Sequence, residues 1–304
     1  MINQTLRKTK EYLKPYYKKL DRAYYAYGRP LIWLSHRQRI GSLIHQDIFT
    51  DVRTYCMFLG QARSGHSIIA SLLDAHRHIV LSDELDALKY IGAGFDREQL
   101  FHLILKKSRM QAHQGRKKSG RRGKYYSYEV PGQWQGKYEH IGIIGDKKGG
   151  ASLNRLASNP GLLEQLRKTV GLKVKLIVVM RNPYDSISTQ FMRNKSGRAL
   201  EETTDRYFDS CRNIDEIRRQ VNSPDILFVR HEDFVAEPVR LLSEICRFLD
   251  TDASAEYLND CASTVYRSPV KSRHEIHWPP ALIDKVKKQT DQFDFLEEYA
   301  WSGK

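Results

Sequence analysis

The stretch FLGQARSGHSIIASLLDAH, residues 58–76, constrains the fold of this chain more than any other. An apolar run of strand type leads into a glycine-containing loop, and a segment with helical spacing follows. Backbone N–H groups in such a loop can surround a phosphate. The nucleotide-binding pattern G-x-x-x-x-G-K-[ST] is met by Gly60, Gly65 and Ser67, but His66 stands in place of the lysine. The loop is therefore either a damaged kinase loop or a loop for a different anionic nucleotide.

The rest of the chain alternates between short apolar runs and segments of helical spacing. Strand-type runs lie at 54–60, 78–82, 140–146, 174–181 and 225–234. They are almost continuously apolar, as expected of strands that are covered on both faces. Helical segments lie at 67–76, 151–169, 184–195, 199–221 and 237–249. This alternation predicts an α/β fold of three layers, like that of P-loop NTPases, with a central parallel sheet flanked by helices.

Composition along the chain suggests three parts. Residues 1–50 are basic and aromatic, and we expect an N-terminal arm that packs on the domain or touches an anionic membrane surface. Residues 51–304 are expected to form one domain. Within it, residues 108–129 are rich in Lys and Arg and lack an apolar period, which predicts an exposed, mobile loop.

The net charge favours anionic ligands. The chain has 50 Lys and Arg against 36 Asp and Glu, a formal charge of +14.

The four cysteines of the chain lack a pairing pattern and are expected to be free thiols. No apolar signal core or membrane span is evident, so a cytoplasmic protein is expected. No metal is expected, because no group of His, Cys and Asp has ligand spacing; His231 and His274 are interpreted as structural.

A second anion site is predicted in VKLIVVMRNPYDSISTQFMRN, residues 174–194. A buried strand ends at Arg181, and Asn182 and Pro183 are suited to the start of a helix. The planar fork of Arg181 and a hydroxyl of the following helix, which carries Ser186, Ser188 and Thr189, can close on one phosphate.

These motifs together resemble the sulfotransferases that use 3′-phosphoadenosine 5′-phosphosulfate (PAPS). The first motif of that family is similar to ARSGHS, and the second to RNPYDSIST. Further similarity lies in DILFVRHEDFVAEPVRLLSEICRFLD, SRHEIHW and FDFLEEYAW, so that the resemblance spans about residues 54–301. The family binds its donor without a Walker lysine and without Mg²⁺, so the resemblance favours a loop for a different anionic nucleotide over a damaged kinase loop.

The resemblance implies roles for residues on the donor side. The 5′-phosphosulfate would be lined by Arg63, Ser64, Gly65, His66 and Ser67. The 3′-phosphate would be held by Arg181 and Thr189, and Lys271 and Arg273 would close over the nucleotide. The chain departs from the family at two of these positions, because His66 replaces a usual Thr and Thr189 a usual Ser.

On the acceptor side, the resemblance implies a carboxylate base. Glu84 matches that position best, and Asp83 is second. The segment IGDKKGG resembles the family's G-[DE]-K, which makes Lys147, or else Lys148, the lysine beside the transferred group. Arg63 and Lys147 would offset charge on the leaving phosphate.

The implied function is transfer of a sulfuryl group from PAPS to an acceptor hydroxyl, on a carbohydrate or glycolipid. Two alternatives remain open at this point. One is a P-loop phosphotransferase that uses ATP and Mg²⁺. The other is a non-enzymatic module that binds polyanions or membranes through its positive charge. Nucleic acid is not an expected partner of the sulfotransferase.

Overall fold

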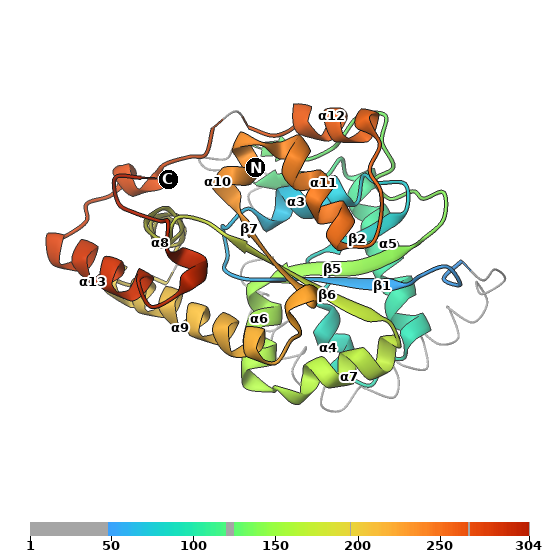
Figure 1. Cartoon of the computed structure of the whole chain (residues 1–304), viewed down its shortest axis with the longest axis horizontal. Helices are drawn as coiled ribbons and strands as arrows, with labels where there is room; N and C mark the ends of the chain where they lie inside the picture. The colour runs from blue at the N-terminus through green and yellow to red at the C-terminus, as the bar shows by residue number, and fades with distance from the viewer. Residues whose placement is uncertain (1–47, 120–124, 195, 267, 304) are drawn as a thin grey trace, which may run out of the picture.

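The computed structural model of the chain describes residues 48–119, 125–194, 196–266 and 268–303. The predicted N-terminal arm therefore lies almost entirely outside the described residues. Five parallel strands form the central sheet, in the order β2-β5-β1-β6-β7 (Figure 1). Their bounds are Thr54–Leu59 for β1, Ile79–Asp83 for β2, Ile143–Gly149 for β5, Lys173–Met180 for β6 and Ile226–Arg230 for β7.

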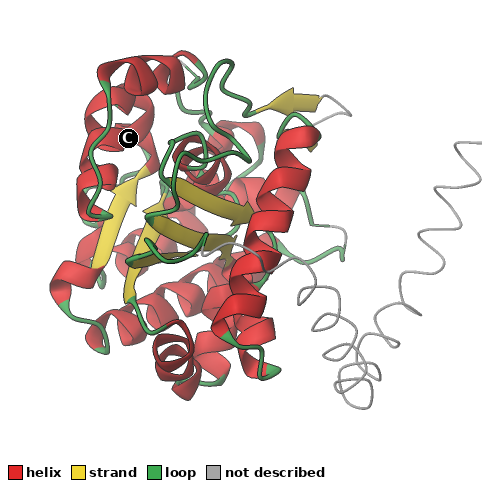
Figure 2. Ribbon diagram, turned by 90° about the vertical axis from the view of Figure 1, so that its right-hand side faces the viewer, coloured by secondary structure: helices red, strands yellow, loops and turns green. Residues whose placement is uncertain are grey.

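Helices cover both faces of this sheet (Figures 1 and 2). One face carries α3 (His66–Leu73), α10 (His231–Ala236), α11 (Pro238–Phe248) and α12 (Ala255–Ser263). The other carries α4 (Ala87–Gly92), α5 (Arg97–His113), α6 (Gly150–Ser158), α7 (Gly161–Val170), α9 (Leu200–Arg219) and α13 (Pro280–Thr290). Successive residues of β1 enter opposite cores, with Met57 in one and Phe58 in the other. This two-sided burial explains the continuously apolar strands and confirms the predicted three-layer α/β fold.

Two predicted elements differ in extent from the observed ones. The run 225–234 contains only the five residues of β7, because α10 begins at His231. The helical segment 151–169 is divided into α6 and α7 at Asn159 and Pro160. Proline restricts the residue before it to extended conformations, and Asn159 has φ −149° and ψ 86°. A helix can restart at Pro160 but cannot continue through it.

The segment 108–129, predicted as an exposed and mobile loop, contains regular secondary structure. Its first residues are the end of α5, and the segments β3 (Lys117–Ser119) and β4 (Tyr125–Ser127) pair as an antiparallel hairpin. Residues 120–124 lie outside the described part. Polar contacts hold this segment to the rest of the domain. The buried carboxylate of Asp74 pairs with Arg116 and accepts a hydrogen bond of 2.8 Å from the Ser108 hydroxyl. Hydrophobic periodicity gives no sign of an anchor built from a buried ion pair.

Cys56, Cys211, Cys246 and Cys261 are all buried and free. Among the helices of the described residues, none combines the length and the apolar character that crossing a membrane requires.

The start of α8 (Pro183–Met192) depends on a cap that the sequence predicts. The Asn182 side chain accepts a hydrogen bond from the Tyr184 N–H at 3.0 Å and donates one to the Ala300 carbonyl at 3.0 Å. We expect Asn182→Ala to lower the free energy of unfolding by about 1–2 kcal/mol in urea denaturation. The control is Asn222→Ala, because Asn222 precedes a short 3-10 helix without a side-chain cap bond. An equal loss in both variants would contradict a specific capping role.

Candidate active site

Most of the predicted site residues lie at one edge of the sheet. Since all five strands are parallel, their carboxyl ends meet at the same edge, where open α/β sheets bind ligands. The loop 60–65 follows β1, Asp83 ends β2, Lys147 lies near the end of β5, and Arg181 follows β6. The fold therefore gathers segments that are far apart in the sequence.

The first loop requires glycine for two reasons. Gly65 has φ +100°, a left-handed conformation that side chains disfavour. A Cβ atom at this position would also lie 2.3 Å from Nδ1 of His231. The buried Ser64 hydroxyl donates to the Gln61 carbonyl at 2.9 Å and stabilises the turn, while Arg63 is exposed. The loop thus presents its main chain and the start of α3 to the edge of the sheet.

The buried side chain of His66 lies against the main chain at the start of the first loop. Its ring is buried, contacts the Gly60 and Gly149 main chain, and places Nε2 3.1 Å from the Leu59 carbonyl oxygen. Nε2 must donate in this bond because the carbonyl oxygen can only accept. Burial, and next the charge of Lys147, lower the pKa of His66 to about 3, so the ring is neutral. The imidazole does not take the place of a Walker lysine, and the predicted phosphate contact falls to the His66 backbone N–H.

The low pKa of His66 predicts a loss of stability in acid. The unfolded histidine has a pKa near 6.5, so as the pH falls the unfolded chain binds this proton first. The stabilisation by neutral His66 is complete above pH 6.5 and is lost progressively towards pH 3. We expect it to account for a fall of about 2 kcal/mol in unfolding free energy between pH 6.5 and pH 5.

Urea denaturation of the wild type and His66→Gln over this pH range measures that contribution. Glutamine can still donate to the Leu59 carbonyl but does not titrate, so its pH slope should be shallower. Burial also lowers the pKa of His231, to about 4, and this histidine contributes equally to both proteins. Identical slopes for the two proteins would contradict the assignment to His66.

Glu84 and Lys147 meet beside the loop. The Lys147 ammonium group lies 2.6 Å from Glu84 Oε1, donates to the Ser67 hydroxyl at 3.0 Å, and pairs with Asp83. The other oxygen of Glu84 lies 2.5 Å from Lys148 Nζ. Two carboxylates, two lysines and the hydroxyl of Ser67 at the start of α3 therefore form one cluster at the ends of β2 and β5.

Exposure separates the two carboxylates of this cluster. The Glu84 side chain is 47% exposed, whereas that of Asp83 is 2% exposed, so only Glu84 can meet an acceptor without rearrangement. Burial acts to raise the pKa of Glu84, but Lys147 and Lys148 outweigh it and lower this pKa below its ordinary value. Glu84 is thus a carboxylate at neutral pH.

Asp146 is a site residue that the sequence analysis missed. Its carboxylate accepts hydrogen bonds from the Ser82 hydroxyl at 2.8 Å and from three successive backbone N–H groups, those of Leu85, Asp86 and Ala87, at 2.9–3.1 Å. These bonds hold the turn that carries Glu84, whose φ is +66°. Since both oxygens serve this turn, Asp146 is not available in this conformation as the strand aspartate of a Mg²⁺ site. Its position directly before Lys147 in IGDKKGG is the signal that could have identified it.

Arg181 and Thr189, the residues of the predicted second anion site, lie together beside the first loop. Arg181 Nη1 lies 3.3 Å from the Thr189 hydroxyl and 3.3 Å from the Arg63 carbonyl. Ser272 completes the group, because its hydroxyl accepts from Thr189 at 3.0 Å and from Arg181 at 3.4 Å. The sequence analysis missed Ser272, although it singled out both of its neighbours.

The remaining candidates lie apart from this group. The Ser188 hydroxyl accepts from the Trp278 indole at 3.0 Å and thus points away from Arg181. The Arg273 guanidinium donates to the carbonyls of Ala300 and Gly303, at 2.9 Å each, and so holds the C-terminal segment instead of facing the sheet edge. Lys271 is exposed beside Ser272.

His231 also belongs to the site by position. Its ring lies against Gly65, and burial together with the charge of Arg181 keeps it neutral. The sequence analysis interpreted His231 as structural. Its place directly after β7, at the same edge as the other site residues, is the signal that could have indicated its proximity.

A loop at a helix start, a strand-end arginine and a carboxylate–lysine cluster are the kinds of group that a nucleotide-dependent transferase requires. Residues 152–255 match the model of the family described as "Sulfotransferase family". The matched segment contains Arg181 and Thr189. This partial match agrees with the predicted resemblance to the sulfotransferases.

Solved structures with similar chains are also sulfotransferases. One is the sulfotransferase domain from the Synechococcus PCC 7002 olefin synthase, at 18% identity, covering 80% of this chain and 96% of that chain with a TM-score of 0.49. Another is the sulfotransferase domain from the curacin biosynthetic pathway, at 16% identity, with coverage of 79% and 97% and a TM-score of 0.49. Mouse sulfotransferase SULT7A1 complexed with PAP has 13% identity, coverage of 83% and 92%, and a TM-score of 0.46. No curated protein sequence matches the chain.

Proposed function

We propose that this protein transfers the sulfuryl group of PAPS to a hydroxyl of a carbohydrate or glycolipid, with Glu84 as the general base. The observation that carries the proposal is the double contact of Lys147. Its ammonium group touches both the exposed Glu84 carboxylate and the Ser67 hydroxyl in the first turn of α3, directly after the first loop. The proposed base for the acceptor is thus in direct contact with the lysine that would face the donor.

Each residue of the site has a separate role in the proposed reaction. The acceptor hydroxyl gives its proton to Glu84 as its oxygen bonds to sulfur. The bond from sulfur to the 5′-phosphate oxygen breaks, and adenosine 3′,5′-bisphosphate leaves with the electron pair. Arg63 and Lys147 offset the charge that develops on the leaving phosphate. Arg181 and Thr189, joined by Ser272, hold the 3′-phosphate.

Radiolabelled sulfate transfer from PAPS tests the acceptor class. The purified chain is offered a neutral oligosaccharide, a glycolipid, a tyrosine peptide and a small phenol, with Glu84→Gln as the matched inactive control. Label in the sugar acceptors supports the proposal. Label in only the peptide or the phenol would overturn the acceptor class and leave sulfuryl transfer intact, whereas no label in any acceptor would count against the whole assignment.

Ligand-dependent melting distinguishes a PAPS-dependent sulfotransferase from a phosphotransferase that uses ATP and Mg²⁺. Adenosine 3′,5′-bisphosphate should raise Tm, since a ligand that binds only the folded state stabilises it. ATP with Mg²⁺ should have a smaller effect, because Asp146 is committed to the turn at Glu84. A larger shift with ATP and Mg²⁺ would favour the phosphotransferase.

We propose residues 51–304 as the catalytic unit, with a cytoplasmic location. The arm at 1–50 is proposed to make peripheral contact with an anionic membrane. The support is its basic and aromatic composition and the formal charge of +14. Vesicle co-sedimentation of the full chain, with and without anionic lipid, tests the membrane contact; equal recovery with both lipids would contradict it.

A further inference from the structure

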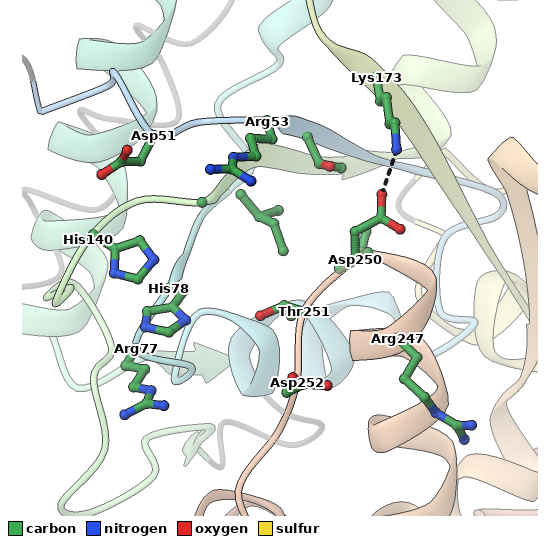
Figure 3. A pocket seen from close by; sticks show the side chains of 14 residues that line it. Asp51, Arg53, Arg77, His78, His140, Lys173, Arg247, Asp250, Thr251 and Asp252 are labelled. Carbon is green, nitrogen blue, oxygen red and sulfur yellow. Dashed lines mark hydrogen bonds and ion pairs between the residues drawn. The ribbon is translucent and has the colours of Figure 1, made fainter.

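A second group of polar side chains lies at the opposite end of the sheet. A cavity of about 850 Å³ opens there, where the strands begin (Figure 3). Arg53 precedes β1, His78 precedes β2, and Lys173 begins β6. Because donor binding belongs to the carboxyl edge, this cavity is separate from the proposed active site.

Two histidines and a glutamate converge beside this cavity. The rings of His78 and His140 face each other, with centroids 3.8 Å apart and an interplanar angle of 30° (Figure 3). Glu139 places Oε2 3.3 Å from Nε2 of His78. One ligand atom from each of the three residues can be chosen so that all lie within 4.8 Å of one another.

The main chain holds the two contributing segments in register. The Glu139 N–H donates to the Arg77 carbonyl at 2.9 Å, and Gly142 and Ile143 both donate to the His78 carbonyl, at 3.0 and 3.1 Å. The His78 N–H in turn donates to the His76 ring at 3.1 Å. The three side chains are therefore placed by paired backbone and need only torsional adjustment to meet a common ion.

We propose that His78, Glu139 and His140 bind a zinc ion. Two imidazole nitrogens and one carboxylate oxygen are a ligand set that Zn²⁺ accepts, with the fourth position left to water. Typical Zn–N and Zn–O distances of about 2.0–2.2 Å bring ligand atoms to roughly 3.3–3.5 Å from one another, close to the separation already present between His78 and Glu139. His78 and His140 line the cavity, so an ion can enter from solvent.

One neighbouring charge competes with the ion. Arg77 lies 3.5 Å from Glu139, but both side chains are more than half exposed. An exposed ion pair of this kind contributes little, so Arg77 can turn to solvent when the carboxylate binds zinc. Since the site lies far along the sheet from Glu84 and Arg181, zinc should stabilise the loop before β5 without being required for donor binding.

Zinc titration of the full chain without a polyhistidine tag, after dialysis against a chelator, tests the site. Calorimetry should give one Zn²⁺ per chain, and Tm should rise with zinc concentration. We expect His140→Ala to weaken the affinity by at least about tenfold, and Glu139→Gln, which keeps the side-chain shape, to weaken it as well. His277→Ala is the control, because His277 is an exposed histidine outside the cluster.

Three results of the zinc titration itself would overturn the assignment. These are no zinc binding by the wild type, unchanged affinity in both His140→Ala and Glu139→Gln, or a comparable loss in His277→Ala. Binding of adenosine 3′,5′-bisphosphate should be the same with and without zinc. Loss of nucleotide binding on zinc removal would place the ion in the donor site and would also contradict the proposal.

Discussion

Replacement of Glu84 by glutamine is expected to reduce turnover by about a hundred- to ten-thousandfold, the usual contribution of a positioned general base. Glutamine keeps the shape of the side chain and removes its basicity. Binding of adenosine 3′,5′-bisphosphate should remain nearly intact, because Lys147 keeps its contact with Ser67. Steady-state kinetics with a productive acceptor and calorimetry with the nucleotide measure the two effects separately.

Asp83→Asn is the matched comparison for this experiment. Asp83 pairs with the same lysine but is buried, so it cannot meet an acceptor hydroxyl as Glu84 can. We expect a much smaller fall in turnover. Retention of most activity in Glu84→Gln, combined with a large loss in Asp83→Asn, would transfer the role of base to Asp83.

Arg181→Ala is expected to weaken binding of adenosine 3′,5′-bisphosphate by about ten- to a hundredfold, which corresponds to roughly 1.5–3 kcal/mol. The reason is the loss of a charge-assisted contact to the 3′-phosphate. Adenosine 5′-phosphate, which lacks that group, should lose much less affinity. Calorimetric titration of both nucleotides into both proteins gives the difference directly.

Thr189→Val separates phosphate binding from the structural contacts of Arg181. Arg181 also donates to the Arg63 carbonyl, so its loss can disturb the first loop. Valine at 189 removes one hydroxyl and leaves the arginine in place. A smaller loss that is still selective for the 3′-phosphate should result. Equal losses for the two nucleotides in both variants would place the 3′-phosphate elsewhere.

Local patterns in the sequence determined the sheet, the first loop and the spacing of the second site. Strands buried on both faces must be apolar throughout, and each of the five runs became a strand of the central sheet. Arg181 lies just before α8 and Thr189, eight residues later, lies within it. This spacing places the guanidinium 3.3 Å from the hydroxyl. The preference for Glu84 over Asp83 as the general base came from the family resemblance. The greater exposure of the Glu84 side chain is consistent with it.

Only the tertiary structure decided where several polar side chains point. Nothing in the local sequence indicates that His66 turns to the Leu59 carbonyl, that Arg273 holds the C-terminal segment, or that Arg116 anchors a hairpin on Asp74. The partners lie on other segments, up to tens of residues away. Hydrophobic periodicity reports which face of an element is buried, whereas the direction of a buried polar group follows from the donors and acceptors that folding brings to it. For the same reason, His78 and His140 carry no recognisable ligand spacing, and only the pairing of their backbones places them side by side.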